Sequence, residues 1–159
     1  MEKTLTSAEY ESLAELRYQI RCFLHFSEQA SRAAGLEPHQ HQLMLALKGM
    51  PKPMRPRIGD MAERLQIRHH SAVELANRLS SGGYVRRHRG GEDGREVLLS
   101  LTPKGEKVLR ELSLHHRAEL RMRGPALIAA LRRVIQTSKK GKGVPTRVAS
   151  RTRRKNQER

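Results

Sequence analysis

The chain has 159 residues, about the length of one domain, and its 36% of apolar residues include few aromatic ones, which favours packed helices over a β-sandwich or β-barrel. Its 32 basic and 16 acidic residues give a net charge of +16, and a surplus of this size predicts a polyanionic partner. The sequence has no run of 18 apolar residues and no signal-peptide pattern, and Cys22 is its only cysteine. We therefore expect a cytoplasmic protein with no membrane partner and no internal disulfide.

Two helices are predicted in the first third of the chain. Thr6 and Glu9 fit a capping box that opens a long first helix, which Gly35 ends. The apolar stripe of this helix consists of Leu13, Leu16, Ile20, Phe23 and Leu24. A second helix is predicted from Pro38 to about Lys48, where a glycine follows.

The central part of the chain is predicted to form two short helices followed by a β-hairpin. Three prolines between residues 51 and 56 indicate an extended loop. One helix is predicted from about Gly59 to Leu65 and the next from about His70 to Ser81. Strands are predicted over Tyr84–Arg89 and Arg95–Leu101, around a glycine-rich tip.

Two more helices are predicted after the hairpin. Thr102 fits an N-cap and Pro103 the first helical position of a fifth helix that runs to about residue 123. The Gly124-Pro125 pair is expected to end it, and the apolar stripe over 126–135 predicts a sixth helix.

Half of the net charge belongs to the C-terminal segment 137–159. It has nine basic residues and one acidic residue, a net charge of +8, and almost no apolar content. Such a segment cannot bury enough apolar surface to offset the loss of chain entropy on ordering, so a disordered basic tail is predicted.

Five segments have a recognisable order and spacing: Ile58-Gly59-Asp60-Met61-Ala62-Glu63-Arg64-Leu65, Leu75-Ala76-Asn77-Arg78-Leu79, Gly83-Tyr84-Val85-Arg86-Arg87, Asp93-Gly94-Arg95 and Leu101-Thr102-Pro103-Lys104-Gly105. Together they resemble the signature of the MarR family of transcription regulators, and the resemblance covers roughly residues 8–136 of the domain 1–136. It implies a mainly α fold with a small β-hairpin wing (α+β). In this fold a winged helix-turn-helix lobe (about 38–102) joins a helical dimerisation lobe (about 6–35 and 103–136).

The resemblance also implies a function and its partners. The chain is expected to bind double-stranded DNA as a homodimer and to act as a regulator, usually a repressor, whose affinity for DNA responds to a small-molecule effector or to stress. No cofactor and no enzymatic activity are expected.

In a helix-turn-helix the second helix enters the major groove of DNA. At about 100° per residue, one face of the predicted helix 70–81 is apolar and expected to be buried: Ala72, Leu75, Ala76 and Leu79. The opposite face carries His70, Val73, Glu74 and Asn77. There Asn77 suits adenine, Glu74 suits cytosine and Val73 suits the thymine methyl group.

Two features qualify this assignment. Glu74 stands where a basic or hydroxyl residue is expected, and phosphates would repel it. The alternative for the whole face is an ordinary solvated surface. Phosphate contacts are expected from the residues at the flanks: Arg68, His69, Ser71 and Arg78.

The predicted hairpin is strongly basic. Its cationic or titratable side chains are those of Arg86, Arg87, His88, Arg89 and Arg95. A basic wing of this kind follows the phosphate backbone or reaches into a minor groove. Asp93 is expected to brace the wing by pairing with an arginine rather than to contact DNA. The alternative is a wing whose charges serve solubility alone.

The sequence contains two kinds of candidate sensor residue. Cys22, between Arg21 and Phe23 on the first helix, loosely resembles the cysteine of the peroxide-sensing branch of the family, and the alternative is a small buried apolar residue. Four histidines and two glutamates lie on helices that are expected to meet: His39, His41, His115, His116, Glu111 and Glu119. Their spacing matches no tight ligand motif, so no metal site is predicted.

Three other functions compete with a sequence-specific regulator. An architectural, sequence-tolerant DNA-binding protein would depend mainly on the basic tail. A winged helix that serves only protein contacts is disfavoured by the basic wing. An enzyme is disfavoured because no phosphate-binding loop, nucleophile motif or carboxylate pair is found.

Overall fold

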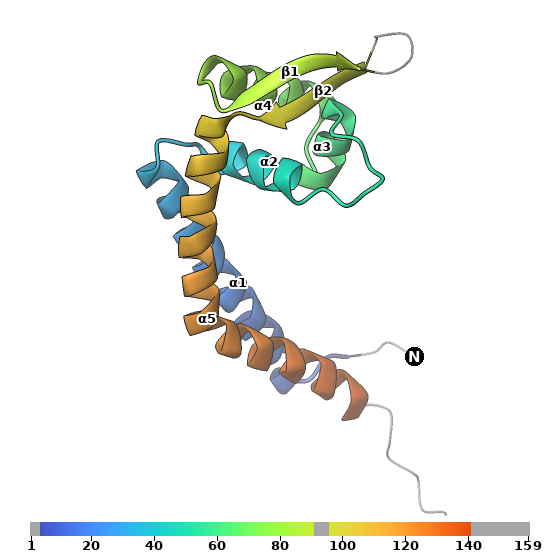
Figure 1. Ribbon diagram of the computed structural model, residues 1–159. Coiled ribbons are helices and arrows are strands. Elements are labelled where there is room, and N and C mark those ends of the chain that lie inside the picture. The colour runs from blue at the N-terminus through green and yellow to red at the C-terminus, as the bar shows by residue number, and fades with distance from the viewer. Residues whose placement is uncertain (1–3, 91–95, 141–159) are drawn as a thin grey trace, which may run out of the picture.

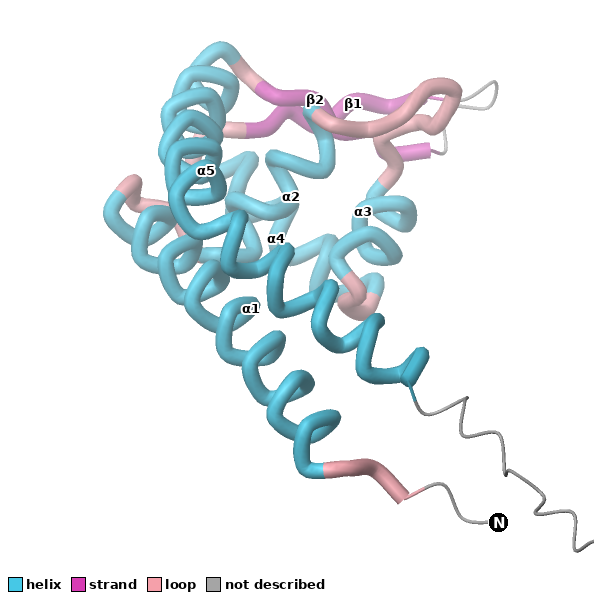
Figure 2. Tube along the Cα trace, turned by 90° about the horizontal axis from the view of Figure 1, so that it is seen from below, coloured by secondary structure: helices cyan, strands magenta, loops and turns pink. Residues whose placement is uncertain are grey.

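The computed structural model describes residues 4–90 and 96–140. Its elements are α1 (Ser7–Ala33), α2 (Pro38–Lys48), α3 (Ile58–Leu65), α4 (His69–Ser81), β1 (Val85–Gly90), β2 (Glu96–Leu101) and α5 (Pro103–Lys140). The long helices α1 and α5 lie side by side, and the other elements form a lobe at one end of them (Figures 1 and 2). The predicted mainly helical fold with a β-hairpin is confirmed.

Both ends of α1 follow from the sequence. The Thr6 side chain accepts a hydrogen bond from the Glu9 backbone N–H (3.3 Å), and the Glu9 carboxylate accepts one from the Thr6 backbone N–H (2.8 Å), so the predicted capping box is confirmed. The Glu9 carboxylate also accepts from the Thr6 hydroxyl (2.9 Å), and the bonds that it accepts from the Thr6 backbone N–H and, to a smaller extent, from this hydroxyl lower the pKa of Glu9. The helix ends where Gly35 adopts a φ of +76°, which costs a residue without a Cβ little.

The core lies in the lobe formed by α2, α3, α4 and the hairpin. The predicted apolar stripe of α4 is confirmed, since Ala72, Leu75, Ala76 and Leu79 are all buried. They pack with Leu43, Met44, Met61, Val85 and Leu99. Between α3 and α4 the chain turns at Gln66, whose φ of 54° lets the Ile67 backbone N–H bond to the Ala62 carbonyl (3.0 Å). The helix-turn-helix is therefore fixed both by its core and by its turn.

The last helix differs from the prediction. The expected break at Gly124-Pro125 does not occur, and α5 continues as one helix with Pro125 inside it. Proline costs a helix one backbone hydrogen bond and clashes with the Cβ of the preceding residue, but Gly124 has no Cβ. Buried Ala130, one turn further, and the packing of α5 on α1 hold the second half in place. The helix changes direction partway along its length (Figure 1), as expected when a proline lies inside.

The helix α5 also extends four residues beyond Gln136, to Lys140. The first residues of the predicted tail are therefore helical, and the remainder, 141–159, lies outside the described residues. Every helix in the described part of the chain is too short or too polar to cross a membrane.

Candidate nucleic-acid interface

The exposed face of α4 carries three of the four residues predicted to meet base edges. His70, Glu74 and Asn77 are exposed. Val73 was expected on this surface, but it is half-buried and packs against the core, because α3 and the hairpin close over it: it lines a groove with Ile58 and Val97. The exposed face of α4 that is predicted to meet base edges is therefore polar.

The flanking residues differ in their accessibility. Arg68, His69 and Arg78 are exposed, as phosphate contacts need to be, whereas Ser71 is half-buried. Arg78 lies 3.8 Å from the Glu74 carboxylate, one helical turn away, and both side chains are 66% exposed. This exposed ion pair partly offsets the negative charge that Glu74 brings to the face.

The hairpin contacts α4 directly. The Arg87 guanidinium on β1 donates a hydrogen bond to the Asn77 side-chain oxygen on α4. The two side chains come from the two segments that the sequence assigned to DNA contact. The structure therefore brings a candidate base reader and a wing cation together.

The cations of β1 are divided between the two faces of the ribbon. In the antiparallel register Arg87 lies opposite Leu99, and Arg89 opposite Val97. Cross-strand partners share a face, so these two arginines lie on the side of the buried Leu99 and of α4. Arg86 and His88 lie on the other side, opposite Ser100 and Leu98. Asp93 and Arg95 lie outside the described residues.

An ion-pair network at the tip end of the β1–β2 ladder was not predicted from the sequence. The Glu96 carboxylate at the start of β2 pairs with Arg55 (2.8 Å) and Arg57 (3.3 Å). Arg57 also pairs with Asp60 in the first turn of α3 (3.0 Å), and this carboxylate raises the pKa of Arg57. The residues are up to 41 positions apart, so no local motif marks them.

The candidate sensor residues lie away from the wing. Cys22 is half-buried on α1 and contacts Tyr18, whose pKa it raises. Of the four histidines, His41 and His116 come together, with ring centroids 4.7 Å apart. His39 and His115 are both exposed. Within the residues that the structure describes, no three histidine, cysteine or acidic side chains are placed to hold a metal ion.

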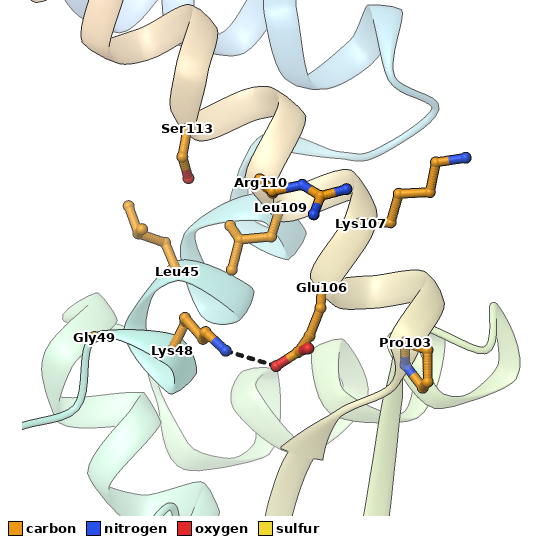
Figure 3. Close-up of a pocket in the computed structure, with 9 residues that line it drawn as sticks. All are labelled: Leu45, Lys48, Gly49, Pro103, Glu106, Lys107, Leu109, Arg110 and Ser113. Carbon is orange, nitrogen blue, oxygen red and sulfur yellow. Dashed lines mark hydrogen bonds and ion pairs between the residues drawn. The ribbon is translucent and has the colours of Figure 1, made fainter.

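The two lobes meet at a cavity of about 640 Å³ between the end of α2 and the start of α5 (Figure 3). Leu45 and Leu109 give it an apolar wall, and Arg110 adds a cationic group. Lys48 on α2 pairs with Glu106 on α5 across its lower side (2.6 Å). A molecule bound here would contact both α2 and the long helix α5.

Comparisons with known proteins agree with this geometry. Residues 34–96 match a family model described as "MarR family". No curated protein matches the sequence. Among solved structures, AbsC, a MarR family transcriptional regulator from Streptomyces coelicolor, has a TM-score of 0.69 at 20% identity, covering 88% of this chain and 97% of that chain. MepR, a transcription regulator of the Staphylococcus aureus multidrug efflux pump MepA, has a TM-score of 0.65 at 14% identity, covering 77% and 94%. A MepR mutant bound to an oligodeoxyribonucleotide has a TM-score of 0.59 at 17% identity, covering 85% and 99%.

Proposed function

Because this chain carries a MarR-family segment over residues 34–96 on the fold of MarR proteins, we propose that it is a transcription regulator that binds double-stranded DNA as a homodimer. The observation that carries the proposal is the contact between Asn77 on the exposed face of α4 and Arg87 on the wing. An amide that can read a base therefore stands beside a guanidinium that can hold a phosphate.

In the proposed complex α4 enters the major groove. His70, Glu74 and Asn77 face the base edges, while Arg68 and Arg78 contact phosphates at its flanks. Arg87 and Arg89, on the α4 side of the ribbon, follow the adjacent backbone or minor groove. The net charge of +16 supports a polyanionic partner of this kind.

The homodimer is proposed from the apolar surface of the two long helices. In the described chain, large apolar side chains of α1 and α5 are exposed, and they include Leu13, Ile20, Leu24, Leu120, Ile128, Leu131 and Ile135. A second copy that packs on α1 and α5 would cover them. A two-fold dimer places its recognition helices about one turn of DNA apart, so half-sites about 10 base pairs apart, or a multiple of this spacing, are expected.

Two measurements test this function. Sedimentation of the purified protein at micromolar concentration is expected to give a dimer, and a monomer would contradict the proposal. Genomic DNA fragments retained at moderate salt are expected to share a near-palindromic sequence. Retention without any common sequence would instead support the architectural alternative, for which the high net charge is the favouring observation.

We further propose that the regulator is a repressor and that the cavity between α2 and α5 takes its effector. The apolar wall and Arg110 suit a small amphiphilic anion. Anilinonaphthalene sulfonate, a fluorescent amphiphilic anion, is a direct probe, and Arg110→Ala is expected to weaken its binding and its effect on DNA affinity. Arg117→Ala, at an exposed position elsewhere on α5, is the matched control. Equal probe binding by both variants would contradict this assignment of the cavity.

A further inference from the structure

We propose that Glu96 is the residue that positions the wing for DNA, by tying the start of β2 to the segment that leads into α3. The inference rests on the proposed DNA-binding function. It assigns to Glu96 the bracing role that the sequence suggested for Asp93.

The ion pairs form a continuous path from the wing to the helix-turn-helix. One oxygen of the Glu96 carboxylate lies 2.8 Å from Arg55 and the other 3.3 Å from Arg57. Arg57 is the N-cap residue of α3 and pairs with Asp60 in that helix. Two carboxylates and two guanidinium groups thus alternate, and each arginine is held by at least one carboxylate.

The backbone supports the same connection. The Leu99 backbone N–H donates a hydrogen bond to the Pro56 carbonyl (2.9 Å), and Arg57 forms an isolated antiparallel bridge with Leu98. The segment before α3 therefore lies along the outer edge of β2 like a short third strand. Glu96 and its partner Gly90 are the last pair of the β1–β2 ladder before the tip. Without Glu96, the ladder end next to the tip loses its side-chain anchor.

Glu96 could affect DNA binding through its negative charge or through the position of the wing, and the two roles predict opposite results. The side chains are substantially exposed, with Arg55 at 50% and Glu96 at 30%, and exposed ion pairs add little to global stability. A carboxylate beside the DNA-binding surface also repels phosphates. If Glu96 acted only through its charge, its removal would strengthen DNA binding. If it positions the wing, its removal weakens DNA binding.

The first experiment compares Glu96→Gln with Glu63→Gln in the full chain. Both remove one negative charge from the lobe while keeping side-chain size, and Glu63 is exposed on α3. We expect Glu96→Gln to lower the affinity for a retained DNA fragment about fivefold. Glu63→Gln is expected to leave that affinity equal or slightly higher. Unchanged or tighter binding by Glu96→Gln, with a parent that binds, overturns the positioning role and leaves the proposed function standing.

A second experiment tests whether Glu96 acts through the wing. Arg87→Ala is expected to reduce the affinity for DNA less in the Glu96→Gln background than in the parent. In a misplaced wing, Arg87 already contributes less to DNA binding. Exchange of the Leu99 amide hydrogen is expected to be faster in Glu96→Gln without DNA. Additive losses together with unchanged exchange would overturn the proposal. A parent that retains no DNA fragment would overturn the proposed function itself, and the exchange rate would still report whether Glu96 holds β2 to the segment before α3.

Discussion

Asn77 is the side chain of α4 best suited to read a base, and in the free protein its oxygen is already engaged by Arg87. A paired contact with adenine needs both the amide oxygen, as acceptor, and the amide nitrogen, as donor. Because an amide oxygen has two lone pairs, in the proposed complex it can accept from adenine while it still accepts from Arg87, which would then hold the Asn77 amide in place for the base. In the proposed complex the amide of Asn77 and the guanidinium of Arg87 would therefore act as a pair.

Replacing Asn77 by alanine is expected to change which base is preferred at one position. The loss should be on the order of 1–3 kcal/mol, confined to the base pair that Asn77 contacts. Competition between DNA sites that differ at single base pairs measures it. An equal loss on every sequence would show that Asn77 contacts a phosphate instead.

The stability of the protein is expected to depend on pH through His41. It is buried, and neither ring nitrogen has a hydrogen-bond partner among the described residues. The neighbouring ring of His116 is held by the Leu112 carbonyl and by Ser27 (2.7 Å each), so it offers His41 no acceptor. Burial, with a smaller contribution from His116, lowers the pKa of His41 from 6.5 to about 4.

The direction of the pH effect follows from this shift. The unfolded chain binds the proton of His41 near pH 6.5 and the folded chain only near pH 4, so its contribution to the free energy of unfolding is complete above pH 6.5 and declines as the pH falls towards 4. Urea unfolding at pH 7 and pH 5 should show a smaller loss on acidification for His41→Leu than for the parent. His39→Leu, at an exposed position, is the control. The same loss in all three proteins would contradict the prediction.

At the scale of elements, the wing meets α5 through a tightly packed junction. The Thr102 hydroxyl donates to the Gly83 carbonyl (2.6 Å) and accepts from the Gly105 backbone N–H (3.0 Å), so one side chain caps α5 and ties it to the hairpin. A Cβ on Gly105 would overlap the carbonyl group of Tyr84. The spacing of threonine and glycine in this motif is therefore explained by packing.

Gly105→Ala is expected to destabilise the protein by about 1–3 kcal/mol, because backbone atoms rather than a mobile side chain must move. Gly59→Ala is the matched control: a Cβ there meets no atom within 4 Å, and alanine should favour α3 by about 0.5–1 kcal/mol. Thermal unfolding measures both. A Gly105→Ala variant as stable as the parent would show that the junction can open without cost.

The sequence predicted those elements whose signals are local. The cap at Thr6, the apolar stripe of α4 and the order of the strands depend on neighbouring residues, and the structure confirms them. The continuity of α5 through Pro125 could not be predicted, because it depends on packing against α1. The partners of Glu96 and the burial of Val73 also depend on which elements meet. Which β1 cations lie on which face of the hairpin depends on the register of β1 with β2, and the sequence alone does not give this register.

At the scale of the whole molecule, the two ends of α5 lie in different surroundings. Its first turn adjoins the hairpin, whereas its last turn lies at the opposite end of the molecule, near the start of α1 (Figure 1). Along its bent axis, a helix of 38 residues is about 57 Å long at about 1.5 Å per residue, so its ends are closer together than this. The 19 residues that follow Lys140 reach at most about 68 Å when fully extended. The segment would therefore reach DNA in the proposed complex only by running back along much of α5.

Ending the chain after Lys140 tests what this segment contributes, and unlike a cut after Gln136 it leaves α5 whole. The cut removes seven basic residues and one acidic residue. Four or five cations on the same DNA would contribute roughly 4 units to the slope of log affinity against log salt, at about 0.9 for each phosphate neutralised.

Because the segment starts far from the wing, we expect the truncated protein to keep its sequence preference and to change that slope on a short operator duplex by less than about 1 unit. Competition binding at two salt concentrations, truncated against full-length protein, measures both quantities. If truncation reduces the salt slope by about 4 units and leaves the sequence preference intact, the segment runs back along α5 to the operator. Loss of the preference together with the affinity would instead make the basic segment the principal DNA-binding element, as the architectural alternative requires.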